Sequence, residues 1–254
     1  MRHFFALMVA VLSWTATFAQ RIYVGVDVFH KREQRLFNDV GGYILKPDYP
    51  SVFASLSYGI NFGYQVLPKL TLETGLYRNT LISRTNFVGT VPSFSNAQGA
   101  FQLPLRVKLL LLSWGNRERN RLEAFSGVAF SIVNRETGWM GSGSKGFGSN
   151  GTTVLTSEYD DYLLKRSFWS AELGASFSRE LGKRQRMMFT AAYTYQWGLS
   201  GTVKRTDVRY TVGGRDYQAT VNANGGGHFY TIGLKYLIRR QKRSADAPYA
   251  PDTK

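Results

Sequence analysis

The sequence contains no cysteine and only three histidines among its 254 residues. Small secreted proteins often compensate for a thin core with disulfides, so this fold must hold without covalent cross-links. The few histidines stand apart from any nucleophile and base that could form a hydrolytic site. We therefore predict no catalytic residue, no metal site and no cofactor.

Long hydrophobic runs are also missing, since no segment has the roughly 20 apolar residues that a membrane-spanning helix requires. The apolar run at residues 4–12 follows Arg2 and precedes the small-residue stretch 17–19, an order typical of a cleaved signal peptide. We expect residues 1–19 to be removed. If the remaining chain lies within a membrane, it must form a closed β-barrel, because only a barrel would then satisfy its backbone in lipid.

Acidic residues are scarce: 17 Asp and Glu stand against 32 Lys and Arg, which gives a formal net charge of +15. Such a charge suggests nucleic acid as a partner, but the basic residues gather at the ends of predicted segments instead of along one face. These groups are Arg117, Arg119 and Arg121; Lys183, Arg184 and Arg186; and Arg239, Arg240, Lys242 and Arg243. Lipid phosphates lie at such positions around a membrane protein, so we predict membrane lipid and no nucleic acid.

The stretch 229–238 alternates between two kinds of side chain. One set of alternate positions is wholly apolar: Tyr230, Ile232, Leu234, Tyr236 and Ile238. The other set includes Gly233 and Lys235. Alternate residues of a strand point to opposite faces, so the pattern favours lipid on one side and a packed polar lumen on the other.

The same alternation recurs in seven earlier segments. They are residues 21–29, 52–64, 70–79, 101–109, 122–132, 169–178 and 187–199. The connections between them alternate long and short, as in outer-membrane barrels. We therefore predict an all-β fold, an eight-stranded antiparallel up-and-down transmembrane β-barrel over residues 20–240, followed by a basic, disordered periplasmic tail at 241–254.

Two other architectures fit the alternation. Residues 208–221 form two β-rich runs about Gly213 and Gly214, which indicates a hairpin. Its faces are too polar for lipid, so we place it outside the membrane, with a ten-stranded barrel as the alternative. The second alternative architecture is a soluble β-sandwich or lipocalin-like barrel, because alternation alone does not show which face contacts water.

The predicted inner face carries a set of charged residues. They are Asp27, Glu73, Arg106, Lys108, Glu123, Glu172 and Lys235. Carboxylates and cations on the neighbouring third, fourth and fifth strands can pair across the sheet. Side chains fill the interior of an eight-stranded barrel, so we expect a structural plug and not an ion path or a pair of catalytic carboxylates.

The predicted loops offer candidate contact residues. Gly141–Gly146 contains the spacing G-x-G-x-x-G but follows no βαβ pattern, so no dinucleotide site is predicted. We interpret this stretch as a mobile loop tip. The candidate contacts there and in the later loop are Trp139, Met140, Phe147, Arg209 and Arg215, with Lys145 and Arg205 as further partners for lipopolysaccharide phosphates. His30 and His228 are interpreted as polar residues of the barrel rim.

The fourth segment also carries a family resemblance. Its aromatic-x-x-Pro-Leu-x-x-Lys run, Phe101 to Lys108, is followed by a polar turn and the strand 122–129. This pattern resembles the PorT-like, porin-domain outer-membrane barrels of Bacteroidota, of the small OmpA/OmpX type. The spacing of Thr231, Gly233, Tyr236 and Ile238 resembles the C-terminal signal read by the barrel-assembly machinery.

These features lead to a functional expectation. We expect a non-catalytic protein in the outer membrane of a Gram-negative bacterium, with a structural or surface-interaction role through its external loops and a surface protein as a possible partner. The PorT-like resemblance implies an alternative, an accessory part of a protein-secretion or gliding apparatus that binds a periplasmic partner. A narrow channel for small solutes is a further alternative.

Overall fold

The computed structural model describes residues 21–42, 56–85, 94–115, 119–134, 140–147, 153–182 and 186–240. No helix in these ranges is long and apolar enough to cross a membrane. The expected signal peptide and the basic tail at 241–254 lie outside the described residues.

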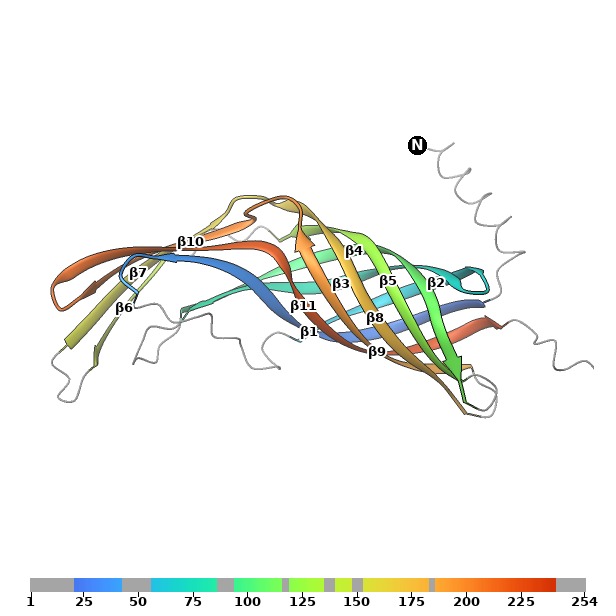
Figure 1. The fold of residues 1–254 in the computed structure, drawn as a ribbon. Coiled ribbons are helices and arrows are strands. Elements are labelled where there is room, and N and C mark those ends of the chain that lie inside the picture. The colour runs from blue at the N-terminus through green and yellow to red at the C-terminus, as the bar shows by residue number, and fades with distance from the viewer. Residues whose placement is uncertain are drawn as a thin grey trace, which may run out of the picture.

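The described residues form antiparallel β-strands joined in one sheet. The strands are β1 (Arg21–Asp39), β2 (Leu56–Leu67), β3 (Leu70–Thr85), β4 (Phe94–Trp114), β5 (Asn120–Val133), β6 (Met140–Phe147), β7 (Thr153–Leu163), β8 (Ser167–Leu181), β9 (Met187–Gly198), β10 (Lys204–Val212) and β11 (Arg215–Arg240). Eight of them follow one another in the order β1-β2-β3-β4-β5-β8-β9-β11, and pairing of β1 with β11 closes the ring (Figure 1). The predicted eight-stranded antiparallel barrel is therefore confirmed.

The two faces of the barrel are inverted relative to a water-soluble protein. Large apolar side chains lie on the outside, where Ile232 is 60% exposed, Val26 56% and Leu173 53%. Charged side chains such as Glu172 and Lys235 are buried inside. A soluble sandwich or lipocalin-like barrel would bury the apolar face, so that alternative is wrong and the barrel is a transmembrane one.

Several strands continue beyond the barrel, where loops were predicted. β1 runs on to Asp39, and the long connection between the predicted strands 122–132 and 169–178 contains β6 and β7. We call the resulting extension the projecting sheet: β6, β7, β10, residues 215–223 of β11 and residues 35–39 of β1. Figure 1 shows it reaching away from one end of the barrel.

The glycine-rich stretch Gly141–Gly146 is part of this sheet. The prediction of a loop tip there is wrong, because Gly143 pairs with Ser157 and the whole of β6 is paired with β7. Glycine and serine have low β-propensity, and the backbone ladder to β7 decides the structure instead. Propensity alone therefore misses this strand.

The predicted hairpin about Gly213 and Gly214 is confirmed. Val212 pairs with Arg215, and both glycines have positive φ values, 57° and 80°, as a two-residue hairpin turn requires. The hairpin lies outside the ring, since β10 pairs with β7 on its other edge. The ten-stranded barrel is therefore wrong, and the polar outward face of this hairpin, with Arg209, Asp216 and Gln218, agrees with its place beyond the membrane.

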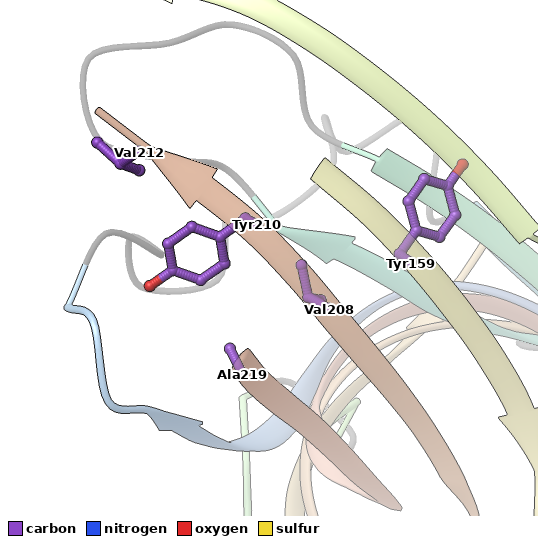
Figure 2. Packing of buried hydrophobic residues seen from close by; sticks show 5 residues of the cluster. All are labelled: Tyr159, Val208, Tyr210, Val212 and Ala219. Atoms are coloured by element: carbon purple, nitrogen blue, oxygen red, sulfur yellow. The ribbon is translucent and has the colours of Figure 1, made fainter. Parts of the chain in front are cut away.

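The projecting sheet has a hydrophobic cluster of its own. Tyr159, Val208, Tyr210, Val212 and Ala219 are buried together on one face (Figure 2). The Tyr210 hydroxyl donates a hydrogen bond to Asp39 at 2.6 Å, which ties the end of β1 to this face. The sheet therefore packs as a folded unit and not as a set of independent loops.

Candidate functional site in the barrel interior

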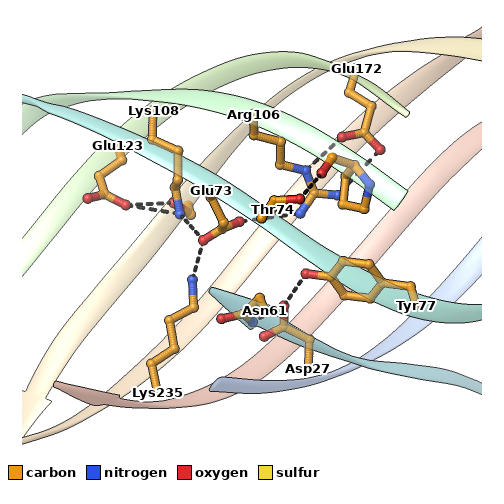
Figure 3. A network of polar contacts seen from close by, with 12 residues as sticks. Asp27, Asn61, Glu73, Thr74, Tyr77, Arg106, Lys108, Glu123, Glu172 and Lys235 are labelled. Carbon is orange, nitrogen blue, oxygen red and sulfur yellow. Dashed lines mark hydrogen bonds and ion pairs between the residues drawn. The ribbon is translucent and has the colours of Figure 1, made fainter. Parts of the chain in front are cut away.

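Glu73 of β3 is the centre of the polar interior. Its Oε2 atom accepts hydrogen bonds from the Tyr23 hydroxyl at 2.6 Å and from Lys235 Nζ at 2.6 Å. Lys108 Nζ donates to the same oxygen at 3.4 Å, and Arg106 donates to Oε1 at 3.4 Å. Figure 3 shows this carboxylate surrounded by the three cations. The contact with Lys235 crosses the barrel from β3 to β11.

Arg106 of β4 connects Glu73 to a second carboxylate. Its Nε atom donates to Glu172 of β8 at 2.7 Å, and one terminal nitrogen donates to the other Glu172 oxygen at 3.3 Å. The guanidinium carbon also lies 5.6 Å from the ring centre of Tyr77 and 5.4 Å from that of Phe125. Two carboxylates and two aromatic faces thus hold the arginine in place.

The remaining inner carboxylates are held in different ways. Lys108 Nζ lies 3.2 Å from Glu123 of β5. Asp27 of β1 instead accepts hydrogen bonds from the Asn61 amide at 2.6 Å and from the Tyr77 hydroxyl at 2.9 Å. The structure therefore brings all the predicted inner charges into one interior. We call this set the lumen cluster: Asp27, Glu73, Arg106, Lys108, Glu123, Glu172 and Lys235.

Register and glycine placement explain why these side chains can meet. Glu73 and Arg106 are direct cross-strand partners, so their side chains leave the sheet side by side. Gly63 faces the Tyr23 ring so closely that a Cβ atom there would lie 1.9 Å from a ring carbon. Only a glycine leaves room for Tyr23 to reach Glu73 across the interior.

Little space remains between these side chains. One cavity of about 10 Å³ touches Asp27, Tyr77 and Arg106, and another of about 20 Å³ touches Glu73 and Lys235. Each of these volumes is close to that needed by a single water molecule. The interior is thus a filled polar core.

A second charged group was missed by sequence reasoning. We call it the mouth cluster: Lys31, Glu33, Arg35, Asp161 and Lys204. Glu33 lies 3.6 Å from Lys31 Nζ and 3.8 Å from an Arg35 nitrogen, and Lys204 Nζ lies 3.5 Å from Asp161. Burial lowers the pKa of Lys204, against the opposing effect of Asp161.

The signal for the mouth cluster lies in β1. Lys31, Glu33 and Arg35 continue the inward-facing alternate positions of β1 to which Tyr23 and Asp27 belong. The first predicted strand ends at residue 29, although the alternation continues to Arg35 and β1 itself to Asp39. Asp161 lies on β7, which was not predicted, and Lys204 is the first residue of β10, four residues before the predicted hairpin at 208–221.

The residues of the proposed assembly signal divide between the two faces of β11. Gly233 faces inward against Asp27, where a Cβ atom would lie 2.0 Å from a carboxylate oxygen. Thr231 is half-buried, whereas Tyr236 and Ile238 are exposed on the outside at 41% and 59%.

The candidate contact residues lie on the projecting sheet as far as they are described. Arg209 is exposed and lies 3.2 Å from Asp160 and 3.8 Å from Glu158. Arg215 is exposed beside the hairpin turn. Met140 and Phe147 are the first and last residues of β6, and Trp139 lies outside the described residues.

The two rim histidines contact aromatic residues. His30 stacks on Tyr230 with ring centres 6.4 Å apart, and His228 Nδ1 shares a hydrogen bond of 2.7 Å with the Tyr193 hydroxyl. Within the described ranges, no group of three or more His, Asp or Glu residues could hold a metal ion.

Comparisons with known proteins give structural neighbours alone. No protein family and no curated protein matches the sequence. The chain is similar in structure to the outer membrane protein OprG from Pseudomonas aeruginosa, with 14% identity, 87% of this chain and 97% of that chain covered, and a TM-score of 0.49. The N-terminal β-barrel domain of P. aeruginosa OprF has 12% identity, coverages of 87% and 99%, and a TM-score of 0.42. The outer membrane protein AlkL has 12% identity, coverages of 89% and 94%, and a TM-score of 0.38.

Proposed function

We propose that this protein is an integral outer-membrane barrel with a closed interior that anchors a surface-interaction module, the projecting sheet. The packed lumen cluster carries the proposal, because the two described cavities among its side chains have room for about one water molecule each, which leaves no path for a solute between them. The barrel then acts as a membrane anchor. The projecting sheet then presents the ion-paired outward face of β7 and β10 to the cell exterior.

The change in side chains along β11 supports this division. Its outward positions in the barrel are apolar, as at Ile232 and Leu234, whereas those in the projecting sheet are polar, as at Asp216, Gln218 and Thr220. A single strand thus passes from a surface suited to hydrocarbon to one suited to water. Partner proteins and lipopolysaccharide are the proposed contacts of the polar part.

Conductance in planar bilayers tests the closed interior. We expect the purified protein to give no sizeable single-channel steps, and Glu73→Gln and Arg106→Gln to produce no channel of defined size. Arg209→Gln, on the projecting sheet, is the matched control. Large steps in the unaltered protein that change with Glu73→Gln would favour the narrow-channel alternative instead.

Photo-cross-linking on intact cells tests the interaction role. A photoreactive residue at the exposed position Gln218 should form adducts with surface proteins or lipopolysaccharide, and one at the buried position Gln102 should form none. Equal yields at the two positions would overturn the proposal. The secretion-accessory alternative depends on residues 241–254, which lie outside the described structure, so adducts that require this tail would favour that alternative.

A further inference from the structure

The outer surface of the barrel has an apolar groove where β9, β11, β1 and β2 meet. Its volume is about 680 Å³, within the range of ligand sites in proteins. The outward-facing side chains that line it are Val28, His30, Leu56, Ala191, Tyr193, Tyr230 and Ile232. The groove belongs to the face that contacts the membrane, not to the lumen.

The depth of the groove follows from one small residue. Ala191 is the cross-strand partner of Ile232, which in turn pairs with Val28. In the adjoining row, Tyr193 pairs with Tyr230 and Tyr230 with His30. The short side chain of Ala191 forms a floor between larger neighbours, and the rings form a wall at one end.

Cationic and hydrogen-bonding groups lie beyond that aromatic wall. Arg32 is exposed and is the cross-strand partner of His228, whose ring nitrogen is 2.7 Å from the Tyr193 hydroxyl. The Tyr195 hydroxyl donates to Gln34 at 3.1 Å. No carboxylate occupies an outward position of β1 from Val24 to Gln34 or of β11 from residue 222 to 238. Aromatic and basic groups in this order are typical of the level of lipid head groups.

We propose that this groove binds one membrane lipid with a phosphorylated head group, with an acyl chain along the Ala191 floor and the phosphate beside Arg32 and His228. The apolar lining matches a hydrocarbon chain, and arginine is well suited to bind phosphate in two-point contact. The site shares with the proposed function only the outward orientation of the apolar face. It depends on neither the closed interior nor the contacts of the projecting sheet.

Native mass spectrometry of the protein in detergent micelles tests the site. The added probes are lipid A, phosphatidylglycerol, uncharged diacylglycerol and inorganic phosphate. We expect one bound lipid A or phosphatidylglycerol per protein, and no retained diacylglycerol or inorganic phosphate. Ala191→Trp, which fills the floor, should weaken lipid binding about tenfold, and Arg32→Gln about fivefold.

Matched controls separate a defined site from general adhesion. Ala124→Trp adds the same bulk to an outward, half-buried position on β5, and Arg179→Gln removes an exposed, outward-facing arginine from β8. Both variants should bind lipid like the unaltered protein. The proposal is overturned if Ala191→Trp and Arg32→Gln also bind normally, if the controls lose binding equally, or if diacylglycerol binds as tightly as phosphatidylglycerol. Preference for lipid A or for phosphatidylglycerol supports it in either case and identifies the source of the phosphate.

Discussion

Replacing Glu73 by leucine is expected to destabilise the barrel by about 3–5 kcal/mol, because breaking a buried ion pair leaves charge without compensation. Here one carboxylate contacts Lys108, Lys235 and Arg106, so its loss affects three cations at once. Urea unfolding of the protein refolded into lipid vesicles gives the free-energy change.

Two further variants make this result specific. Glu73→Gln keeps the shape and the hydrogen-bond acceptor for Tyr23, so it should cost less than Glu73→Leu. Combining Glu73→Gln with Lys235→Met removes one charge of each sign and should recover part of the loss. A Glu73→Leu protein as stable as the original would contradict the account of the interior as an ion-paired plug.

Replacing Ile232 by arginine is expected to destabilise the protein by about 2–4 kcal/mol, the cost of a cation on the lipid face of a barrel near the bilayer midplane. Ile232 is 60% exposed, so in a water-soluble protein the same change would cost little. Unfolding in lipid vesicles measures the difference.

The matched control lies on the same strand. Thr220 also points outward, but it belongs to the projecting sheet and donates a hydrogen bond to Asp207 at 3.2 Å. Thr220→Arg places its cation opposite that carboxylate in water, so stability should change by no more than about 0.5 kcal/mol. Equal costs at the two positions would show that β11 does not leave the membrane between them.

The face of each barrel residue could be predicted from the sequence, because strand side chains alternate with a period of two. That rule, with the order of the strands, also places Glu73 beside Arg106. The contact between Glu73 and Lys235 could not be predicted in the same way. It joins strands that are not neighbours, and which residues meet across a barrel depends on its shear and tilt.

The ends of the strands were the least predictable feature. Beyond the membrane, the outward face of β1 no longer needs to be apolar, so Arg32 and Gln34 look like loop residues although the strand continues. The glycine-rich β6 has turn-like composition, and its strand conformation depends on pairing with β7. The mouth cluster was missed for the same reason, since it forms only when these distant segments pair.

The central claim is that the apolar face of the barrel contacts hydrocarbon. The chain has no cysteine, so a spin label on a single introduced cysteine reports one position alone. We would place it at Ile232, at Leu173 and, as the water-exposed reference, at Gln218, and compare collisions with oxygen and with a water-soluble nickel complex in vesicles. The account predicts that labels at Ile232 and Leu173 collide more often with oxygen, and that a label at Gln218 collides more often with the nickel complex. Ready access of the nickel complex to labels at Ile232 and Leu173 in the folded protein would contradict it.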